Sequence, residues 1–288
     1  MAAYTTLGLL SLTWGCSFPF ISISVETIPP LFGSAVRSTL AAAILIALSL
    51  AMGLKFPRFG RGLRPFLALG FFSCSIPFFL LSYAQQHIDS GLAAILVATT
   101  PLFTTIFRAI RLRRRPAASE ITGILIGLIG VVVLMGPDAL AGLGQDIVAQ
   151  AAALATAAAY ALGIVIASAM PRYPPSVMAS CTLSSATIML WPVALIVDSP
   201  SQIEPALDGI LALAGLIIIG SVVASILYYR VIEMAGATFA SFSTYLNPLV
   251  AVVLGALILS EAITLAMLAA VALILGGVAI AGRVWRRA

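Results

Sequence analysis

The sequence predicts an all-α integral membrane protein with ten transmembrane helices, arranged as two inverted five-helix repeats. The first observation is composition: 61% of the 288 residues are hydrophobic and only 9% are charged, whereas a soluble chain carries about a quarter charged residues. The second is that long uncharged stretches alternate with short charged ones. The third is that the order of features in the first half returns in the second. This composition excludes a soluble enzyme, a nucleic-acid-binding protein and a disordered chain.

Ten stretches have the length of a membrane span, since a helix needs roughly 20 residues to cross about 30 Å of hydrocarbon. The stretches are apolar all round, whereas the strands of a membrane barrel would alternate apolar and polar residues. No Lys or Arg precedes the first stretch, so we expect it to be a span and not a cleaved signal. The expected helices cover residues 4–25, 31–53, 64–86, 89–110, 119–137, 147–170, 175–197, 206–229, 236–259 and 262–283.

The basic residues indicate which way the chain faces. Every Lys and Arg except Arg37 falls in an even-numbered connection, close to one, or at the C-terminus, and the opposite connections carry none. By the positive-inside rule, both termini are expected in the cytoplasm of a bacterium, with the protein in its inner membrane. The run 111–115 is then an orientation signal that meets anionic lipid, and no nucleic-acid partner is expected.

Several other classes of site are not supported by the sequence. Cys16, Cys74 and Cys181 lie singly in apolar stretches, without the spacing of a zinc site or a disulfide scaffold. No metal or cofactor is therefore expected. No carboxylate lies deep in a span and no Walker A motif is present, which favours a facilitator or exchanger. His87, Glu26 and Glu233 remain the candidates for coupling to protons.

The chain reads as a duplication with an offset of 147 residues. This offset places Pro101 on Pro248 and Gly130 on Gly277. We expect a first repeat at 1–137, a periplasmic connection at 138–146 and a second repeat at 147–288. Because each repeat has an odd number of spans, the second must be inverted in the membrane. Inverted repeats are typical of secondary transporters, whose substrates bind near the midplane between the halves.

Polar and aromatic side chains inside the spans are expected to line a central cavity, because such groups are costly when they face lipid. An equally open interpretation is that the hydroxyl groups join helices and the aromatic rings lie at the membrane interface. The candidates for the cavity are Trp14, Phe18, Phe79, Ser82, Tyr83, Gln86, His87, Tyr160, Tyr229, Tyr245 and Asn247.

Three further features have two interpretations each. Pro101 and Pro248 act as hinges for the two gates of a transporter, or they are kinks that the helices tolerate. Arg37 extends to the outer interface or to Glu26, or it faces the outer vestibule and binds a substrate carboxylate. Glycines of the fifth and tenth spans allow close helix packing within the chain, or they form the interface of a homodimer. These glycines are Gly123, Gly127, Gly130, Gly276 and Gly277.

The chain resembles the drug/metabolite transporter superfamily, and within it the EamA-type permeases, including the branch of aromatic amino-acid exporters. The resemblance rests on Trp14-Gly15, Arg37, the stretch YAQQHIDSGLAAILVATTPLFTTIF (83–107), Asn247-Pro248 and LSE (259–261). It implies a fold of the same type and an inner-membrane exporter of small metabolites. It also implies a cavity between spans 1, 3, 4, 6, 8 and 9, which adds Thr99 to the candidates. Arg114 stands where the resemblance leads us to expect an acidic residue, the repeat counterpart of Glu261.

The sequence therefore predicts export of aromatic and other neutral amino acids, or similar metabolites, by alternating access. The expected partners are a small-molecule substrate and the lipid bilayer. Lipophilic drugs or nucleobases remain alternative cargoes on the same fold. Cations would require a buried carboxylate, and sugar phosphates a cluster of intramembrane bases. An enzyme is not expected, because His87, at the end of a span, has no nucleophile in a glycine-rich setting.

Overall fold

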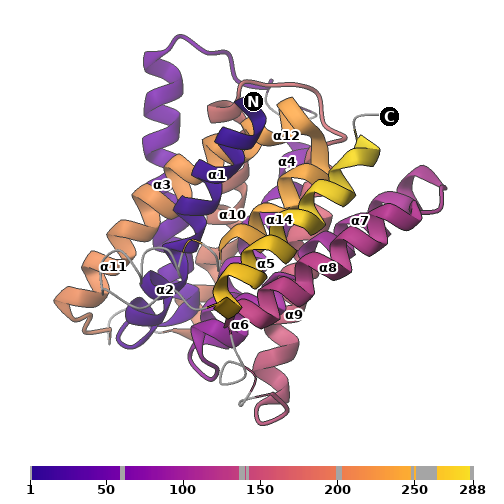
Figure 1. Ribbon diagram of the computed structural model, residues 1–288. Coiled ribbons are helices and arrows are strands. Elements are labelled where there is room, and N and C mark those ends of the chain that lie inside the picture. The colour runs from indigo at the N-terminus through magenta and orange to yellow at the C-terminus, as the bar shows by residue number, and fades with distance from the viewer. Residues whose placement is uncertain are drawn as a thin grey trace.

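The computed structural model describes residues 2–58, 62–135, 140, 143–198, 203–247, 250 and 265–285, and every regular element among them is helical. Figure 1 shows the helices as a bundle. The elements are α1 (Ala2–Gly15), α2 (Ser17–Val25), α3 (Pro30–Ala51), α4 (Arg64–Gly70), η1 (Phe71–Ser75), α5 (Ile76–Gln85), α6 (Ser90–Val97), α7 (Thr100–Leu112), α8 (Ala118–Met135), α9 (Ile147–Ala167), α10 (Pro175–Val197), α11 (Leu207–Ile217), η4 (Ile218–Val223), α12 (Ala224–Ser241) and α14 (Leu265–Trp285).

Seven helical segments of the described chain are long and apolar enough to cross a membrane, and two shorter apolar ones cover Ala118–Leu134 and Leu268–Ala281. The predicted count of ten also depends on residues 248, 249 and 251–264, which lie outside the described residues. Figure 1 shows the N-terminus, the α3–α4 connection and the last turn of α14 toward the same end of the bundle.

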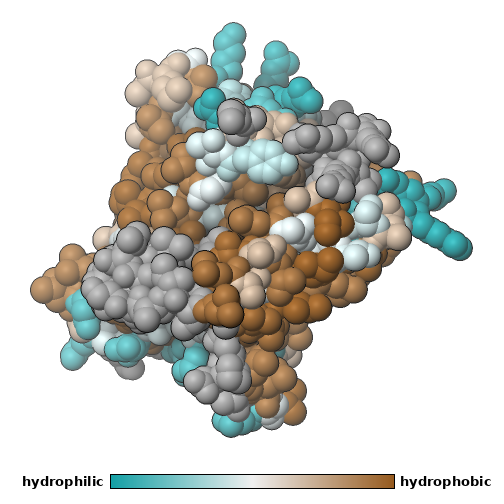
Figure 2. Space-filling view, in the orientation of Figure 1, coloured by the Kyte–Doolittle hydropathy of each residue, from teal (hydrophilic) through white to brown (hydrophobic). Residues whose placement is uncertain are grey.

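The surface is that of a protein embedded in lipid. Many large apolar side chains are exposed, including Ile196 at 82% and Leu211 at 62%. Figure 2 shows hydrophobic side chains across the middle of one face and hydrophilic ones mainly at its edges. A soluble monomer rarely exposes apolar patches of this extent. The predicted all-helical membrane protein is confirmed at this level.

Several spans are interrupted where they approach the centre of the bundle. The first is divided at Cys16, between α1 and α2, and the fourth at residues 98–99, between α6 and α7. Pro101 lies in the first turn of α7, where a missing N–H costs no helical hydrogen bond. The π-helical turns η1 and η4 interrupt the third and eighth spans. Each is a local widening of the helix of the kind that recurs at functional sites.

The end of the eighth span differs from the prediction. The sequence suggests an end near residue 229 because Arg230 follows, but α12 runs without interruption from Ala224 to a kink at Gly236. Gly236 has a φ of 78°, a left-handed conformation that favours glycine and breaks the helix there. The chain is helical again from this point toward Asn247. Arg230 is thus a helical residue and not part of a connection.

The glycines of α8 bring it close to α14. A Cβ on Gly123 would lie 2.6 Å from the backbone of Gly277 and of Ala281, and a Cβ on Gly130 would lie 2.8 Å from Ile274. Small residues allow two backbones to approach in this way. Close packing within the chain, one of the two interpretations of the glycine pattern, is confirmed for these contacts.

One buried carboxylate joins three helices at the end of the bundle predicted to be cytoplasmic. Glu120 of α8 accepts hydrogen bonds from Arg108 of α7 at 2.9 Å and from Arg114 at 3.4 Å. Arg108 also donates to the hydroxyl of Thr238 on α12 at 2.9 Å. Arg114 stands where the resemblance implies an acidic residue. In the structure this arginine pairs with the carboxylate of Glu120.

Candidate substrate site

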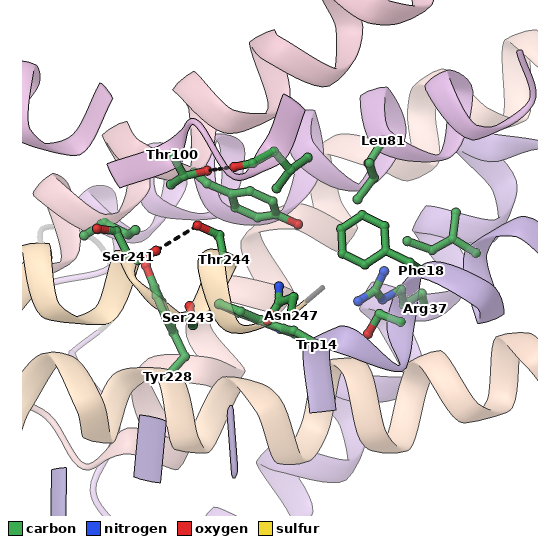
Figure 3. A pocket seen from close by; sticks show the side chains of 15 residues that line it. Trp14, Phe18, Arg37, Leu81, Thr100, Tyr228, Ser241, Ser243, Thr244 and Asn247 are labelled. Atoms are coloured by element: carbon green, nitrogen blue, oxygen red, sulfur yellow. Dashed lines mark hydrogen bonds between the residues drawn. The ribbon is translucent and has the colours of Figure 1, made fainter. Parts of the chain in front are cut away.

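A cavity of about 50 Å³ lies at the centre of the bundle, enclosed by α1, α2, α3, α5, α6, α7, α9, α12 and the helical residues 243–247 that follow α12. Figure 3 shows that it has two different ends. Arg37, Phe18 and Leu81 lie at one end, and Tyr228 and Ser241 lie at the other. The cavity is therefore polarised, with a cation at one end and aromatic and hydroxyl groups at the other.

Three aromatic rings form a wall of this cavity. The ring of Trp14 stacks on that of Tyr160, with centroids 6.3 Å apart, and lies 5.4 Å from that of Tyr228. Trp14 lies just before the break between α1 and α2, at a point where Gly15 lets the chain approach Asn247. A Cβ on Gly15 would come within 2.9 Å of the Asn247 carbonyl oxygen. Such a wall offers a large apolar surface with polar edges.

Arg37 is buried in the interior of the bundle, with 6% of its surface exposed. Its Nε donates to Ser221 Oγ at 2.7 Å and its Nη2 to the Gly220 carbonyl at 3.1 Å, both on η4. Its guanidinium carbon lies 3.9 Å from the centre of the Phe78 ring. The interpretation that Arg37 extends to the membrane interface or pairs with Glu26 is wrong, because the side chain turns inward to η4.

No carboxylate neutralises Arg37 within the part of the chain that the structure describes, where the ion pairs are those of Glu120. Arginine stays charged in proteins, and its five N–H donors are only partly used by the two acceptors on η4. A buried cation is costly unless an anion or several acceptors face it. The Arg37 end of the cavity can therefore receive a negatively charged group.

The other polar groups of the cavity are mostly committed to the backbone. The hydroxyls of Thr100, Ser241, Ser243 and Thr244 each donate to a carbonyl three residues earlier, at 2.6–2.9 Å. Asn247 is different: it is 5% exposed, and its buried Oδ1 has no hydrogen-bond partner in the part of the chain that the structure describes. A buried amide oxygen in this state favours a ligand that brings a donor.

Further hollows continue from the central cavity. One of about 30 Å³ shares Trp14, Tyr160 and Tyr228 with it and also borders Tyr229. Another, of about 350 Å³, lies beyond Tyr229 at the turn after α9. A third, of about 10 Å³, lies on the other side of Arg37. The hollows thus form a series through the bundle, with Tyr229 and Arg37 each shared by two of them.

The structure brings some of the predicted site residues together. Trp14, Phe18, Arg37, Tyr160 and Asn247 all line the central cavity. Tyr229 lines the neighbouring hollow, and Ser82 lines the small hollow beside Arg37. Thr99 precedes the lining residue Thr100, and its hydroxyl donates to the Leu96 carbonyl at 2.6 Å.

The remaining candidates on α5 and just after its end lie on another face. The rings of Phe79, Tyr83 and His87 follow one another along the helix, with centroid distances of 6.3 Å and 4.7 Å. Tyr83 packs against a separate apolar cluster with Ala84, Leu92 and Ala153. The neighbouring candidate Gln86 donates to the Val25 carbonyl at 3.4 Å.

The two other candidates in the ninth span give different results. Tyr245 is fully buried against Gly127 of α8, and its hydroxyl donates to the Ile124 carbonyl at 2.8 Å. It does not line any of the four hollows. Pro248 lies outside the described residues, so its role as a hinge stays a prediction, as does that of Pro101.

One residue that the sequence did not single out belongs to the site. Phe78, one position before the candidate Phe79, lies under the Arg37 guanidinium. Tyr228 belongs to the aromatic wall. The sequence indicates this position, because Ser221, Ser225 and Tyr228 share one helical face of the eighth span.

A polarised cavity buried among apolar membrane helices defines a class of protein, the membrane transporters. The chain belongs to the EamA-like transporter family, which matches residues 1–136 and 148–283. The predicted membership of this family, part of the drug/metabolite transporter superfamily, is confirmed. The chain is a transporter and not an enzyme.

Known relatives extend this result. The chain is 32% identical to the uncharacterized inner membrane transporter YedA of Escherichia coli over 258 residues, which cover 88% of this chain and 81% of that protein. It is 28% identical to an uncharacterized transporter of Archaeoglobus fulgidus over 287 residues, covering 98% and 99% of the two chains.

Two more matches concern substrate and fold. A probable terminal-alkyne amino-acid exporter of Streptantibioticus cattleyicolor is 27% identical over 194 residues, covering 66% of this chain and 63% of that protein. A solved crystal structure superposes on the whole chain and on 99% of its own chain with a TM-score of 0.78 and 23% identity. The latter supports the fold alone.

Proposed function

We propose that this protein exports amino acids with aromatic or other neutral side chains across the bacterial inner membrane. The observation that carries the proposal is the unneutralised Arg37 guanidinium at one end of an aromatic cavity. An α-carboxylate would bind Arg37 through charge-assisted hydrogen bonds. The side chain would lie against the rings of Trp14, Tyr160 and Tyr228.

The α-ammonium group requires an acceptor, and the cavity offers one without a charge. The Asn247 side chain lies beside Trp14, between the two ends of the cavity (Figure 3), and its Oδ1 has no hydrogen-bond partner among the described residues. An ammonium group there would donate to Asn247 and face the aromatic rings, which attract cations. A single cation with a neutral acceptor favours a zwitterion or a carboxylate over a free cation.

We propose alternating access between two inverted five-helix repeats as the mechanism, with Pro101 and Pro248 as hinges. The two family matches begin 147 residues apart, the offset seen in the sequence. The turns η1 and η4 also begin 147 residues apart, at Phe71 and Ile218. Both observations support a duplication, and ten spans would make the second copy inverted.

The direction and location of transport rest on the relatives and on the charges. A relative carries the name of an inner membrane transporter and another that of a probable amino-acid exporter. The distribution of bases supports cytoplasmic termini. Export is therefore the proposed direction in the cell, although a facilitator also carries substrate inward down a gradient.

The first test is uptake of radiolabelled amino acids by proteoliposomes, with and without an imposed pH gradient. We expect saturable uptake of Trp, Phe, Met or Thr that does not depend on the gradient. Dependence on the gradient would direct attention to His87 and Glu233 as proton sites. No uptake of any amino acid by folded protein would contradict the proposal.

A second candidate function is export of flat neutral solutes such as nucleobases. The aromatic wall favours it, since the stacked Trp14 and Tyr160 rings would suit any planar ring. Such a solute would leave Arg37 without an anion. Uracil and adenine in the same panel, with Arg37→Met as the comparison, separate the two: nucleobase transport survives this substitution, and amino-acid transport does not.

A further inference from the structure

The hollow beyond Tyr229 is large enough for an amino acid, and the central cavity is not. The hollow measures about 350 Å³ and the central cavity about 50 Å³. Pockets that enclose small organic ligands usually measure about 300–1,000 Å³. The state described by the structure therefore has a nearly closed centre and an open space beside it. We call this space the vestibule; it lies between residues 167–173 and residues 229–236 of α12.

The vestibule carries one charge of each sign. Arg172 lies on the turn after α9 and Glu233 on α12, and both are exposed. No ion pair involves either of them within the described part of the chain. Both charges are thus available to a solute. On the topology proposed from the bases, this is the cytoplasmic side.

Its apolar lining is unusually adaptable. Met170, Met178 and Met234 border the vestibule together with Tyr173. Methionine side chains are flexible and polarisable, so they fit apolar groups of different shapes. A solute with two opposite charges and a variable apolar side chain would match this combination.

Tyr229 connects the linings of the vestibule and the inner hollow. It borders both the vestibule and the hollow that contains Trp14, Tyr160 and Tyr228. Its hydroxyl lies 2.8 Å from Thr182 Oγ1, which holds the ring against α10. The vestibule and the inner hollow thus lie on either side of this ring, and the inner hollow in turn shares its aromatic wall with the central cavity.

We propose that the vestibule is a separate capture site for zwitterionic amino acids, in which Arg172 binds the carboxylate and Glu233 the ammonium group. From there the amino acid passes Tyr229 to the central cavity. This inference rests on the proposed function, because it takes the same substrate class. It adds a second binding site on the cytoplasmic side.

Protection of a single cysteine from a membrane-impermeant maleimide tests the site. Ser168→Cys places the thiol in the vestibule of full-length protein whose Cys16, Cys74 and Cys181 are replaced by Ala. The reagent is added to inside-out vesicles with L-phenylalanine, 3-phenylpropionate or 2-phenylethylamine. We expect phenylalanine to slow the labelling, and the anion and the amine to require at least about 5-fold higher concentrations, since each lacks one charged contact.

Matched variants assign the effect to the two charges. Arg172→Gln and Glu233→Gln are each expected to raise the half-protecting phenylalanine concentration about 5-fold. Arg115→Gln, an exposed base in the α7–α8 connection outside the vestibule, is expected to leave it unchanged. Equal shifts in all three variants would overturn the assignment to a specific site.

A last variant separates capture from central binding. Arg37→Met removes the proposed central carboxylate site, and phenylalanine is expected to protect the vestibule cysteine as before. Loss of protection in this variant would show that phenylalanine protects the cysteine by binding in the central cavity and not in the vestibule, which overturns the inference. Flux of phenylalanine without vestibule protection would contradict the capture site alone. Protection without flux of any amino acid would contradict the proposed function alone.

Discussion

The two π-helical turns have similar positions but different chemistry. η1 and η4 begin 147 residues apart. Each packs against a long helix from the other half of the chain: η1 contacts α10, and η4 contacts α3. η4 accepts the buried Arg37 through Gly220 and Ser221. At η1, the equivalent of Gly220 is the uncharged Ser73, which lines the inner hollow beside Tyr228. The backbone framework is thus shared, while the charge that gives the cavity its polarity belongs to one side only.

The largest effect on transport is expected when the Arg37 charge, which distinguishes η4 from η1, is removed. Arg37→Met should lower amino-acid flux by roughly 100-fold, because charge-assisted hydrogen bonds are each worth about 1.5–3 kcal/mol. The melting temperature in detergent should not fall, since burial of a charge that no carboxylate neutralises in the described chain is costly to the native protein. Counterflow in proteoliposomes and thermal unfolding measure the two quantities.

The conservative variant makes this comparison sharper. Arg37→Lys keeps the charge but cannot donate in two directions at a fixed spacing. We expect flux about 10-fold below that of the native protein. Full activity in Arg37→Met would remove the assigned role of the cation and the contrast between the two turns.

A smaller loss is expected from filling the space beside the arginine. A Cβ on Gly220 would lie 2.5 Å from Ser17 Oγ and 3.4 Å from Arg37 Nη2. Gly220→Val should therefore displace the guanidinium and reduce flux by about 10- to 30-fold. The matched change at the equivalent position of η1, Ser73→Ala, removes a single neutral hydroxyl and should alter flux less than about 2-fold. Equal losses would mean that both turns serve the substrate alike.

Trp14 lines the hollow that lies between Ser73 of η1 and Gly220 of η4. Trp14→Ala should raise the KM for phenylalanine about 10-fold through lost ring contact. Tyr83→Ala, on the other face of α5, should leave KM within about 2-fold. If the two substitutions act equally, the division of the aromatic residues between cavity and packing cluster is incorrect.

The smallest effect concerns a residue remote from both turns. Tyr245→Phe removes one hydrogen bond to the Ile124 carbonyl. The free energy of unfolding should fall by about 1 kcal/mol, with flux unchanged. A large loss of flux without loss of stability would place Tyr245 at the substrate after all.

The sequence predicted the membrane class, the approximate spans and the glycine contacts because these depend on local composition and small side chains. It did not predict the π-helical turns, since no residue type marks the change of hydrogen-bond register at 71–75 or 218–223. The candidate residues on α5 were chosen for polarity, but Gln86 binds a backbone carbonyl and Phe78 faces the arginine.

The position of Arg37 shows a second limit of the sequence. From its distance to the end of the second span, the Arg37 side chain could either reach the membrane interface or turn into the bundle. The inward orientation depends on acceptors at residues 220 and 221, more than 180 residues away. Asn247 is the opposite case, since an amide in an apolar span already indicated a cavity. The structure adds that the Asn247 Oδ1 is buried and has no hydrogen-bond partner among the described residues.

The contact between α8 and α14 also sets the order in which the protein can be completed during synthesis. The end of α8 precedes the start of α14 by roughly 130 residues. At about 5–20 residues per second, α8 is made some 7–26 seconds before its partner. During that interval the glycine face of α8 lies in the membrane without the helix that covers it. Nascent chains stopped before α14 should therefore be recognised as incomplete by membrane proteases, even though nearly every span has already been inserted.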